Sequence, residues 1–396
     1  IGLDDAMGRG KLGDLTPDLL DAILEEAGRY AGDAVAPLYE SGDRIGAQFD
    51  KGVVTMPPGW GKLYTDWCAA GWNALTGPVE AGGQGLPTAL SAAVTEMWNG
   101  ASMAFGIGPT LTIAAVEALH KHGSEALKAI YLEKLTSGEW TGTMQLTEPQ
   151  SGSDASAMRC RAVLSADGTH YVVNGKKSWI TSGPVARYIV LFAMSEPDKG
   201  ARGITAFLVD GTRDGFHRGK TEPKLGIRAS ATCEIEFQDY VARAEDVLGE
   251  EGQGFKIAMG VLDAGRIGIA SQAIGIARAA YEATVEYVKE RKAFGAPIGT
   301  FQMTQAKIAD MKCRLDAALL LTLRAAWLKG EGKRFSNEAA IAKLTASEAA
   351  MWITHQALQI HGGMGYSKEM PIERYFRDAK ITEIYEGTSE IQRLVI

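Results

Sequence analysis

The feature that most constrains the fold is a change of sequence character near residue 140 and again near residue 245. Between these points come short β-branched and aromatic runs, such as residues 188–192 and 204–209, with no helical segment between them. Strands without intervening helices predict a barrel or sandwich rather than a βαβ sheet. Asp167-Gly168 and Asn174-Gly175 are expected to form tight turns. No GxGxxG follows a strand, which disfavours a Rossmann fold.

Helical patterns flank this central part on both sides. Thr16-Pro17 predicts a helix start, because a hydroxyl cap precedes a proline at the first helical position. Helical, alanine-rich sequence continues from there to about residue 138, and long helical stripes return after Gly254. The predicted fold is therefore an α+β multidomain chain, with an N-terminal α-helical domain (1–140), a β-barrel or sandwich (141–245) and a C-terminal four-helix bundle (246–396).

Length and charge exclude several classes of protein. A chain of 396 residues is too long for a single core. The net charge of −7, without a run of basic residues, argues against nucleic acid as a partner. The four cysteines form no CxxC pair, and a reducing compartment is expected. The apolar stretch 101–119 approaches membrane-spanning length, but Pro109 interrupts it, so we expect buried helices and no membrane contact.

Two segments of the central part have a composition suited to a flat, phosphorylated ligand. Residues 144–154 combine hydroxyls, glycine and backbone donors, although a plain interdomain loop has the same composition. In residues 174–182, strand geometry places Trp179 and Thr181 on one face, where they could stack on and hydrogen-bond a cofactor. A core tryptophan beside a strand threonine is the alternative.

The helical C-terminal part contributes further candidates. Asp263 and Arg266 are three residues apart on one helix face, which is also typical of an exposed ion pair. Residues 290–295 are typical of a helix end with cations in its last turn. Residues 359–366 are typical of a glycine-rich turn after a helix. Glu386-Gly387-Thr388 places a carboxylate where glycine lets the backbone approach a ligand, although solvated loops share this tripeptide. The histidines have no metal-ligand spacing, and no GxSxG is present.

Taken in order, these segments resemble the acyl-CoA dehydrogenase family from about residue 15 to the C-terminus. The resemblance rests on residues 147–154, 179–181, 224–228, 263–266, 290–295, 359–363 and 385–388. It implies a helical domain, a β-barrel and a four-helix bundle, with FAD between barrel and bundle. It also implies a homo-oligomer, usually a tetramer.

Position by position, the resemblance implies two sets of binding residues. The FAD contacts would be Leu146, Thr147, Gly152, Ser153, Trp179, Ile180, Thr181, Arg291, Phe294, Gln302, Gln359, Gly363, Thr388 and Glu390. Of these, residues 291–363 would hold the adenosine diphosphate part, partly across a subunit interface. The acyl-CoA contacts would be Ser153, Leu262, Asp263, Arg266, Tyr385 and Gly387.

The resemblance further implies α,β-dehydrogenation of an acyl-CoA to the trans-2-enoyl-CoA. Glu386 would remove the α-proton while the β-hydrogen leaves as hydride to flavin N5. Its own N–H and a flavin ribityl hydroxyl would bind the thioester oxygen. One branch of the family has its base immediately before the arginine of the Asp…Arg motif; here that position is Gly265, which leaves Glu386 as the candidate. Electrons would pass to electron-transferring flavoprotein.

Substrate and location stay open on sequence alone. The last 150 residues resemble the short-chain, butyryl-type branch and indicate a short- to medium-chain substrate. The N-terminal third resembles the 3-methylmercaptopropionyl-CoA dehydrogenase branch. An acyl-CoA oxidase or flavin monooxygenase on the same fold is the other alternative, while a DNA-associated relative would need a basic patch. Met97, Trp98, Met103 and Phe105 either narrow the acyl pocket or pack a core. A bacterial cytoplasm is expected, or a mitochondrial matrix if a targeting segment was removed.

Overall fold

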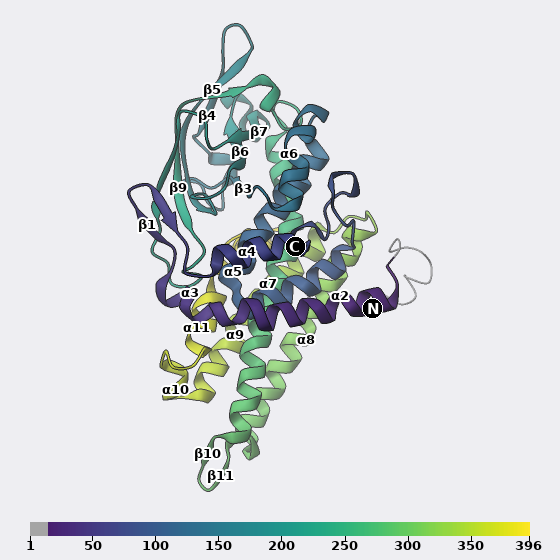
Figure 1. Ribbon diagram of the computed structural model, residues 1–396, viewed down its shortest axis with the longest axis vertical. Coiled ribbons are helices and arrows are strands. Elements are labelled where there is room, and N and C mark those ends of the chain that lie inside the picture. The colour runs from purple at the N-terminus through teal and green to yellow at the C-terminus, as the bar shows by residue number, and fades with distance from the viewer. Residues whose placement is uncertain (1–14) are drawn as a thin grey trace.

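The computed structural model describes residues 15–396 and divides them into a helical part, a sheet and a second helical part (Figure 1). The first fourteen residues of the predicted N-terminal domain lie outside the described residues. The N-terminal part contains α2 (Pro17–Tyr30), α3 (Tyr39–Ile45), α4 (Trp60–Ala69), α5 (Thr88–His122) and α6 (Glu125–Ser137). It also contains a hairpin, β1 (Gln48–Asp50) and β2 (Val53–Thr55), which the sequence interpretation missed.

The predicted start of α2 is confirmed. The Thr16 hydroxyl accepts a hydrogen bond from the Leu19 N–H at 3.2 Å, and Pro17 is the first helical residue. The core of this part is aromatic: Trp60, Trp67 and Trp98 are buried together, and the Trp67 and Trp98 rings meet edge to face.

Helix α5 is two helical halves joined by a kink. Ser102 has extended backbone angles (φ −162°, ψ 105°), which breaks the helix in its middle. Helices α5 and α7 are long and apolar enough to cross a membrane by length and composition alone. Most of the apolar stretch of each is buried against other parts of the described chain, as in core helices of folded proteins. Absence of membrane contact stays a prediction.

The middle part is one curled sheet of seven strands. The strands are β3 (Gly142–Gln145), β4 (Arg161–Leu164), β5 (His170–Thr181), β6 (Tyr188–Met194), β7 (Ile204–Asp210), β8 (Phe216–Thr221) and β9 (Thr232–Arg243). They follow the order β3-β6-β4-β5-β9-β8, with β7 pairing to β6. Only the β3–β6 and β4–β6 pairs are parallel among these described strands. Short 3-10 helices, Ala155–Ala157 and Pro197–Gly203, interrupt the strands, but no α-helix lies between these described strands, and the prediction of a β domain that is not a Rossmann sheet is confirmed.

The two predicted turns of this part have different outcomes. Asp167-Gly168 forms the tight turn between β4 and β5, where Gly168 N–H donates to the Ser165 carbonyl at 2.9 Å. The predicted turn at Asn174-Gly175 is wrong, because β5 runs through both residues. Gly175 instead lies at an irregularity in the pairing with β9. A side chain there would collide with Cys160, which accounts for the glycine.

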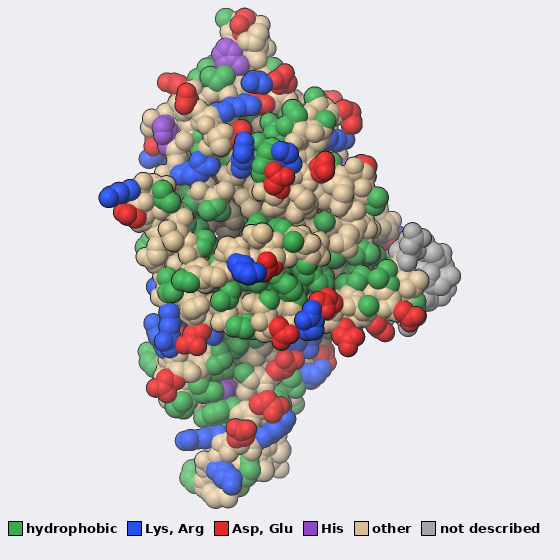
Figure 2. Space-filling model, in the orientation of Figure 1, with side chains coloured by type: hydrophobic (Ala, Val, Ile, Leu, Met, Phe, Trp, Pro, Cys, Tyr) green, Lys and Arg blue, Asp and Glu red, His purple; other side chains and the backbone are tan. Residues whose placement is uncertain are grey.

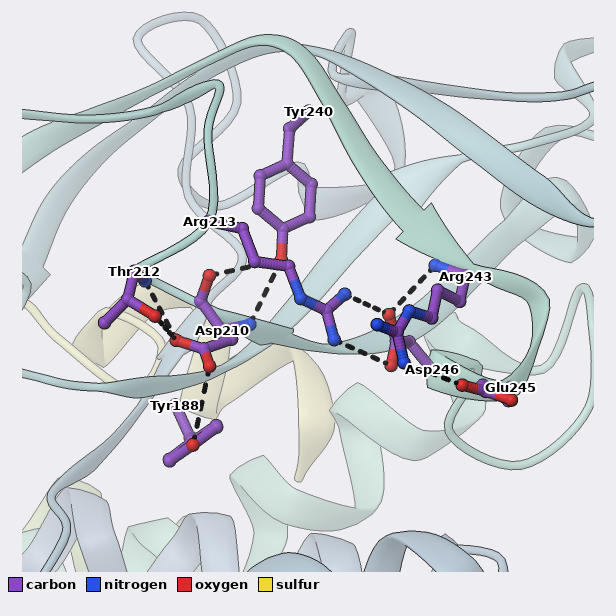
Figure 3. Close-up of polar contacts among 8 residues, drawn as sticks. All are labelled: Tyr188, Asp210, Thr212, Arg213, Tyr240, Arg243, Glu245 and Asp246. Carbon is purple, nitrogen blue, oxygen red and sulfur yellow. Dashed lines mark hydrogen bonds and ion pairs between the residues drawn. The ribbon is translucent and has the colours of Figure 1, made fainter.

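One end of the sheet is held by a polar network. Figure 3 shows the Arg213 guanidinium pointing at the carboxylate of Asp246, with a closest contact of 2.5 Å. In the same view the Tyr240 hydroxyl lies against the backbone of Asp210, donating to its carbonyl at 3.2 Å. These contacts fasten β7 and β9 to the segment that leads into the second helical part.

The C-terminal part is a bundle of long helices. It consists of α7 (Gly254–Glu290), α8 (Gln302–Gly330) and α9 (Ser336–His361), with short α10 (Gly363–Tyr366), α11 (Ile372–Ala379) and α12 (Ser389–Val395). Helix α11 packs against α7 and α9 as the fourth member of the bundle. A small hairpin, β10 (Lys292–Ala293) and β11 (Ala296–Pro297), lies at the end of the molecule opposite the sheet (Figure 1). On the face in Figure 2, acidic and basic side chains are interspersed.

Candidate active site

A cavity of about 200 Å³ lies where the sheet meets the helices, and we call it the Glu386 cavity. The central part contributes loop and strand residues, α7 contributes one face, and the segment before α12 closes the third side. Twelve of the predicted site residues line it: Leu146, Thr147, Gly152, Ser153, Trp179, Ile180, Thr181, Leu262, Arg266, Tyr385, Glu386 and Gly387. The fold therefore brings together segments separated by more than 200 residues in the chain.

The loop after β3 owes its shape to a buried ion pair. The Lys177 ammonium donates to Glu148 Oε1 at 2.7 Å and to the Leu146 carbonyl at 3.2 Å, and both charged side chains are almost fully buried. Glu148 also accepts the backbone N–H groups of Arg159 and Cys160. Burial raises the pKa of Glu148, but Lys177 and these donors outweigh it, so that the pKa lies below its usual value. The Lys177–Glu148 pair thus holds the loop after β3 in place on the side away from the cavity.

Trp179 is exposed at the cavity rather than packed in the core. Its backbone is left-handed (φ +61°), at an irregularity between Lys177 and Ile180 in the pairing with β9. The side chain is 62% exposed. A left-handed non-glycine residue is uncommon, and such strain recurs at functional sites. The core-tryptophan alternative is therefore wrong, and Trp179 and Thr181 both line the cavity as the cofactor interpretation requires.

Glu386 has the most perturbed carboxyl group of the cavity. Its Oε2 is buried and has no hydrogen-bond partner within residues 15–396. Burial raises the pKa of Glu386 to about 7, although the cations of Arg266 and Lys343 oppose the shift. A carboxyl group with a pKa near neutrality can exchange a proton at physiological pH, which is the property of a general base.

The backbone around Glu386 is held by two residues that sequence reasoning missed. Buried Lys343 of α9 donates from Nζ to the Gly387 carbonyl at 2.7 Å, and burial lowers the pKa of Lys343 to about 8. Gln392 Nε2 donates to the carbonyls of Glu386 (3.0 Å) and Gly387 (2.8 Å). The signal available in the sequence was a lone lysine among the small apolar residues 339–346.

The left-handed conformation of this segment explains its glycine. Glu386 has φ +54° and Gly387 has φ +86°, so the chain turns sharply in two consecutive left-handed residues. Thr388 then caps α12 by accepting the Ile391 N–H at 3.3 Å. Tyr385 is fastened on the other side, where its hydroxyl donates to Gln272 Oε1 at 2.6 Å.

The Asp263–Arg266 pair is buried, which corrects the exposed-pair alternative. Arg266 Nη1 lies 2.6 Å from Asp263 Oδ1, and the two side chains are only 5% and 20% exposed. The Ser336 hydroxyl also donates to Asp263. Leu262 and Arg266 line the Glu386 cavity, whereas Asp263 does not. Asp263 thus lies behind the cavity, where it orients Arg266.

The remaining predicted site residues do not line the cavity within this single chain. Arg291, Phe294 and Gln302 surround the β10–β11 hairpin at the far end of the bundle, where Phe294 is 99% exposed. Gln359 and Gly363 lie at the junction of α9 and α10. Thr388 and Glu390 begin α12 beside the cavity without lining it.

A second and larger cavity of about 340 Å³ adjoins the Glu386 cavity along α7. We call it the α5 cavity, because the faces 88–95 and 110–120 of the two halves of α5 form its walls. The walls of the two cavities adjoin. Thr110 and Gly265 line the α5 cavity, and the next residues along the chain, Leu111 and Arg266, line the Glu386 cavity. Met97, Trp98, Met103 and Phe105 line neither cavity and pack in or against the core.

Comparison with known proteins places this geometry in one family. The acyl-CoA dehydrogenase N-terminal, middle and C-terminal domains match residues 18–139, 143–240 and 252–396. The bovine mitochondrial short-chain specific acyl-CoA dehydrogenase is 49% identical over 327 residues, 82% of this chain and 79% of that protein. The acryloyl-CoA reductase (NADH) of Anaerotignum propionicum is 46% identical over 325 residues, 81% of this chain and 82% of that protein.

A solved structure agrees with these sequence relatives. The butyryl-CoA dehydrogenase of Megasphaera elsdenii superimposes with a TM-score of 0.90 at 41% identity, covering 96% of this chain and 97% of that one. The chain therefore belongs to the acyl-CoA dehydrogenase family, whose members are FAD-dependent oxidoreductases. Within that family it is of the short-chain, butyryl-CoA type. The predicted family, fold class, enzyme class and cofactor are confirmed.

Proposed function

We propose that this chain catalyses α,β-dehydrogenation of a short- to medium-chain acyl-CoA with Glu386 as the base. The observation that carries the proposal is the unpaired Oε2 of Glu386, buried in a cavity that it shares with an exposed tryptophan. A carboxyl group in such surroundings is held ready to take a proton from a bound ligand.

The cavity fits a flavin by its own chemistry. Trp179 offers an aromatic face, and Thr147, Ser153 and Thr181 offer hydroxyls around it. Gly152 leaves open space, since a Cβ built on it meets no atom within 4 Å. These residues would hold the ring system of FAD. Bound FAD supplies the acceptor for the hydride that leaves the β carbon of the substrate.

The chain itself prepares the proton transfer. Glu386 removes the α-proton, and the thioester oxygen gains negative charge as it does so. The backbone N–H of Glu386 donates no hydrogen bond within the described residues, so it is free to donate to that oxygen. Lys343 and Gln392 hold the neighbouring carbonyls, which keeps this N–H in position. Leu262 and Arg266, the latter oriented by Asp263, line the route proposed for the CoA moiety.

A second copy of the chain completes the proposed cofactor site. Arg291, Phe294 and Gln302 lie far from the Glu386 cavity of their own chain, and Phe294 is fully exposed. The adenosine diphosphate part of FAD would therefore be held by these residues, with Gln359 and Gly363, of a neighbouring subunit. We propose a homotetramer, with Thr388 and Glu390 supporting the cofactor beside the base. We further propose domain boundaries at 140/141 and 245/246.

Acceptor, direction and location are also proposals. Electron-transferring flavoprotein is the proposed acceptor, and a bacterial cytoplasm or a mitochondrial matrix is the proposed location. The relative described as an acryloyl-CoA reductase favours one alternative, namely that the same site runs in the reducing direction. A base that removes the α-proton in one direction returns it in the other, so Glu386 would keep its place.

An anaerobic titration tests the proposal. The purified protein should be yellow, and butyryl-CoA should bleach its flavin band with formation of the 2-enoyl-CoA. Acryloyl- or crotonyl-CoA added to dithionite-reduced protein measures the reverse direction. If no member of a broad acyl-CoA panel bleaches a flavin-loaded protein, the proposed activity is wrong.

A further inference from the structure

Several hydroxyl groups line the α5 cavity. Thr88, Ser91 and Thr95 recur at spacings of three and four, so they form one stripe along the first half of α5. Thr76 lies on the facing loop. Within residues 15–396 none of these four hydroxyls makes a hydrogen bond, so each is free to bind a ligand or water.

A second and independent feature lies deeper in the same wall. Asn73 and Thr136 are 3% and 1% exposed, and both line the cavity. Asn73 Nδ2 donates to the carbonyls of Leu135 and Thr136, each at 2.9 Å, which fixes the orientation of the amide. Asn73 Oδ1 and Thr136 Oγ1 are left without a partner in the described chain. Buried polar atoms are nearly always paired, so this unpaired acceptor and this unpaired hydroxyl are available to a ligand group or a water.

The charges of the cavity restrict the ligand to uncharged groups. Its acidic and basic lining residues, Glu117 and Lys329, pair with each other at 2.7 Å. His120 lies 3.5 Å from Glu80. No cation among the described lining residues is therefore free to receive a carboxylate, and a dicarboxylic acyl group is disfavoured.

The position of the cavity connects it to the chemistry. Gly265 lines the α5 cavity, and the Glu386 carboxylate lies against this same glycine. An acyl chain whose α carbon is at Glu386 therefore has the α5 cavity next to it, at the side-chain position that Gly265 leaves vacant. At about 340 Å³ the space matches a small-molecule pocket and exceeds what a four-carbon acyl group needs.

We propose that the substrate is an acyl-CoA with a hydroxyl group beyond its β carbon, and that the α5 cavity binds this hydroxyl. The inference rests on the proposed function and names its substrate class. A hydroxyl that donates to Asn73 Oδ1 and accepts from the Thr136 hydroxyl would satisfy both unpaired atoms, and the stripe offers further partners along the wall. A thioether sulfur cannot donate, so a 3-methylmercaptopropionyl group would leave Asn73 Oδ1 unpaired.

The test compares matched thioesters on the flavin-loaded enzyme. The pairs are 4-hydroxybutyryl- with pentanoyl-CoA, 5-hydroxypentanoyl- with hexanoyl-CoA, and 6-hydroxyhexanoyl- with heptanoyl-CoA, in which a methyl group replaces the hydroxyl. For at least one pair, kcat/KM should favour the hydroxylated substrate by about tenfold, the worth of one to two net hydrogen bonds. In Thr95→Val/Thr136→Val this preference should fall several-fold.

Thr65→Val is the matched control, because Thr65 is exposed on α4 away from both cavities. It should keep the wild-type preference. A wild-type enzyme that turns over butyryl-CoA but favours the methyl-ended member of every pair would overturn the inference and leave the proposed function standing. An unchanged preference in the double variant would overturn it as well. Failure of all thioesters would instead reject the proposed function itself.

Discussion

Gly265 faces the carboxylate of Glu386 across the cavity wall. A Cβ built on Gly265 would lie 3.1 Å from both Cδ and Oε2 of Glu386. This separation is shorter than an ordinary van der Waals contact, so the carboxylate occupies the space that any side chain at position 265 would need. The position of the Glu386 carboxylate therefore requires a glycine at position 265 of α7.

Gly265→Ala should lower kcat/KM for butyryl-CoA by roughly tenfold, because the added methyl group pushes the base off its position. Gly260→Ala is the control on the same helix, since its Cβ would meet nothing within 4 Å. Both changes replace glycine inside a helix and should raise helix stability by up to about 1 kcal/mol. Steady-state kinetics and thermal unfolding separate the two effects, and full activity in Gly265→Ala would refute the steric argument.

Glu386→Gln should retain FAD and lose about two to four orders of magnitude in kcat, the usual contribution of a general base. For the wild type, kcat/KM should rise with pH up to about 7 and then level off, because only the ionised carboxylate accepts a proton. Stopped-flow bleaching across pH 5.5–8.5 measures this limb. A variant that still turns over at the wild-type rate would place the base elsewhere.

The same raised pKa has a consequence for stability. Folding favours the protonated form of Glu386, so the carboxyl group makes the fold less stable as pH rises from 4.5 to about 7. Above about pH 7 the loss of stability that Glu386 causes no longer changes with pH. Glu386→Gln should therefore be more stable than wild type at pH 8, with the difference vanishing near pH 4.5. Urea unfolding at the two pH values provides the comparison.

Lys343→Met should move the ascending limb of the pH–rate profile to higher pH. Burial raises the pKa of Glu386, and the Lys343 cation is one of two charges that oppose this. Removing it should lower the rate at pH 6.5 several-fold relative to the rate at pH 8. Lys312→Met, which removes an exposed lysine from α8, is the control and should leave the limb in place. An unmoved limb in Lys343→Met would show that this cation does not reach the base.

Trp179→Ala should weaken FAD binding by about three- to tenfold, since an aromatic contact contributes roughly 0.5–1.5 kcal/mol. Trp179→Phe should be intermediate, because it keeps an aromatic face. Val163→Ala removes another exposed side chain from the same sheet and serves as the control. Flavin fluorescence on dilution measures the dissociation constant, and equal constants in all variants would remove Trp179 from the cofactor site.

Lys177→Met should destabilise the protein by about 3–5 kcal/mol, because it leaves Glu148 buried without its cation. The double variant Glu148→Gln/Lys177→Met should be less destabilised than the single variant. The pKa of Glu148 is lowered in the fold, so its stabilisation is present above pH 4.5 and is lost as the pH falls through the folded value. Denaturant unfolding at pH 7 and pH 3.5 checks both expectations.

Local signals predicted a large part of this architecture from the sequence. The Thr16 cap, the turn at Asp167-Gly168 and a helix end within residues 290–295 depend on neighbouring residues only, and all three are confirmed, although Arg291 and Lys292 follow the helix rather than lie in its last turn. Strand alternation also predicted that Trp179 and Thr181 lie on one face, and both line the Glu386 cavity. The bulge that gives Trp179 its left-handed backbone could not be predicted, because it depends on pairing with β9, some fifty residues away.

What the sequence could not supply are contacts between distant segments. The exposed-pair alternative for Asp263 and Arg266 was wrong because neighbouring elements, including Ser336, bury the pair. The sequence shows Lys343 only as one lysine in a helix. Its role depends on the fold, which brings α9 next to Gly387 so that Lys343 donates to the Gly387 carbonyl. The unpaired Asn73 Oδ1 likewise emerges only once its Nδ2 is seen to be engaged by the chain before Gly138.

The break at Ser102 divides α5 into two half-helices, and both contribute residues to the wall of the α5 cavity. The proposed base lies in the turn around Glu386, whereas residues of both half-helices line the α5 cavity. Under the proposed function, exchanges along residues 88–95 can alter which compounds are accepted while the base keeps its surroundings, because no residue of that face lines the Glu386 cavity. Divergence of specificity within such a scaffold needs few substitutions, and this chain shows where they would occur.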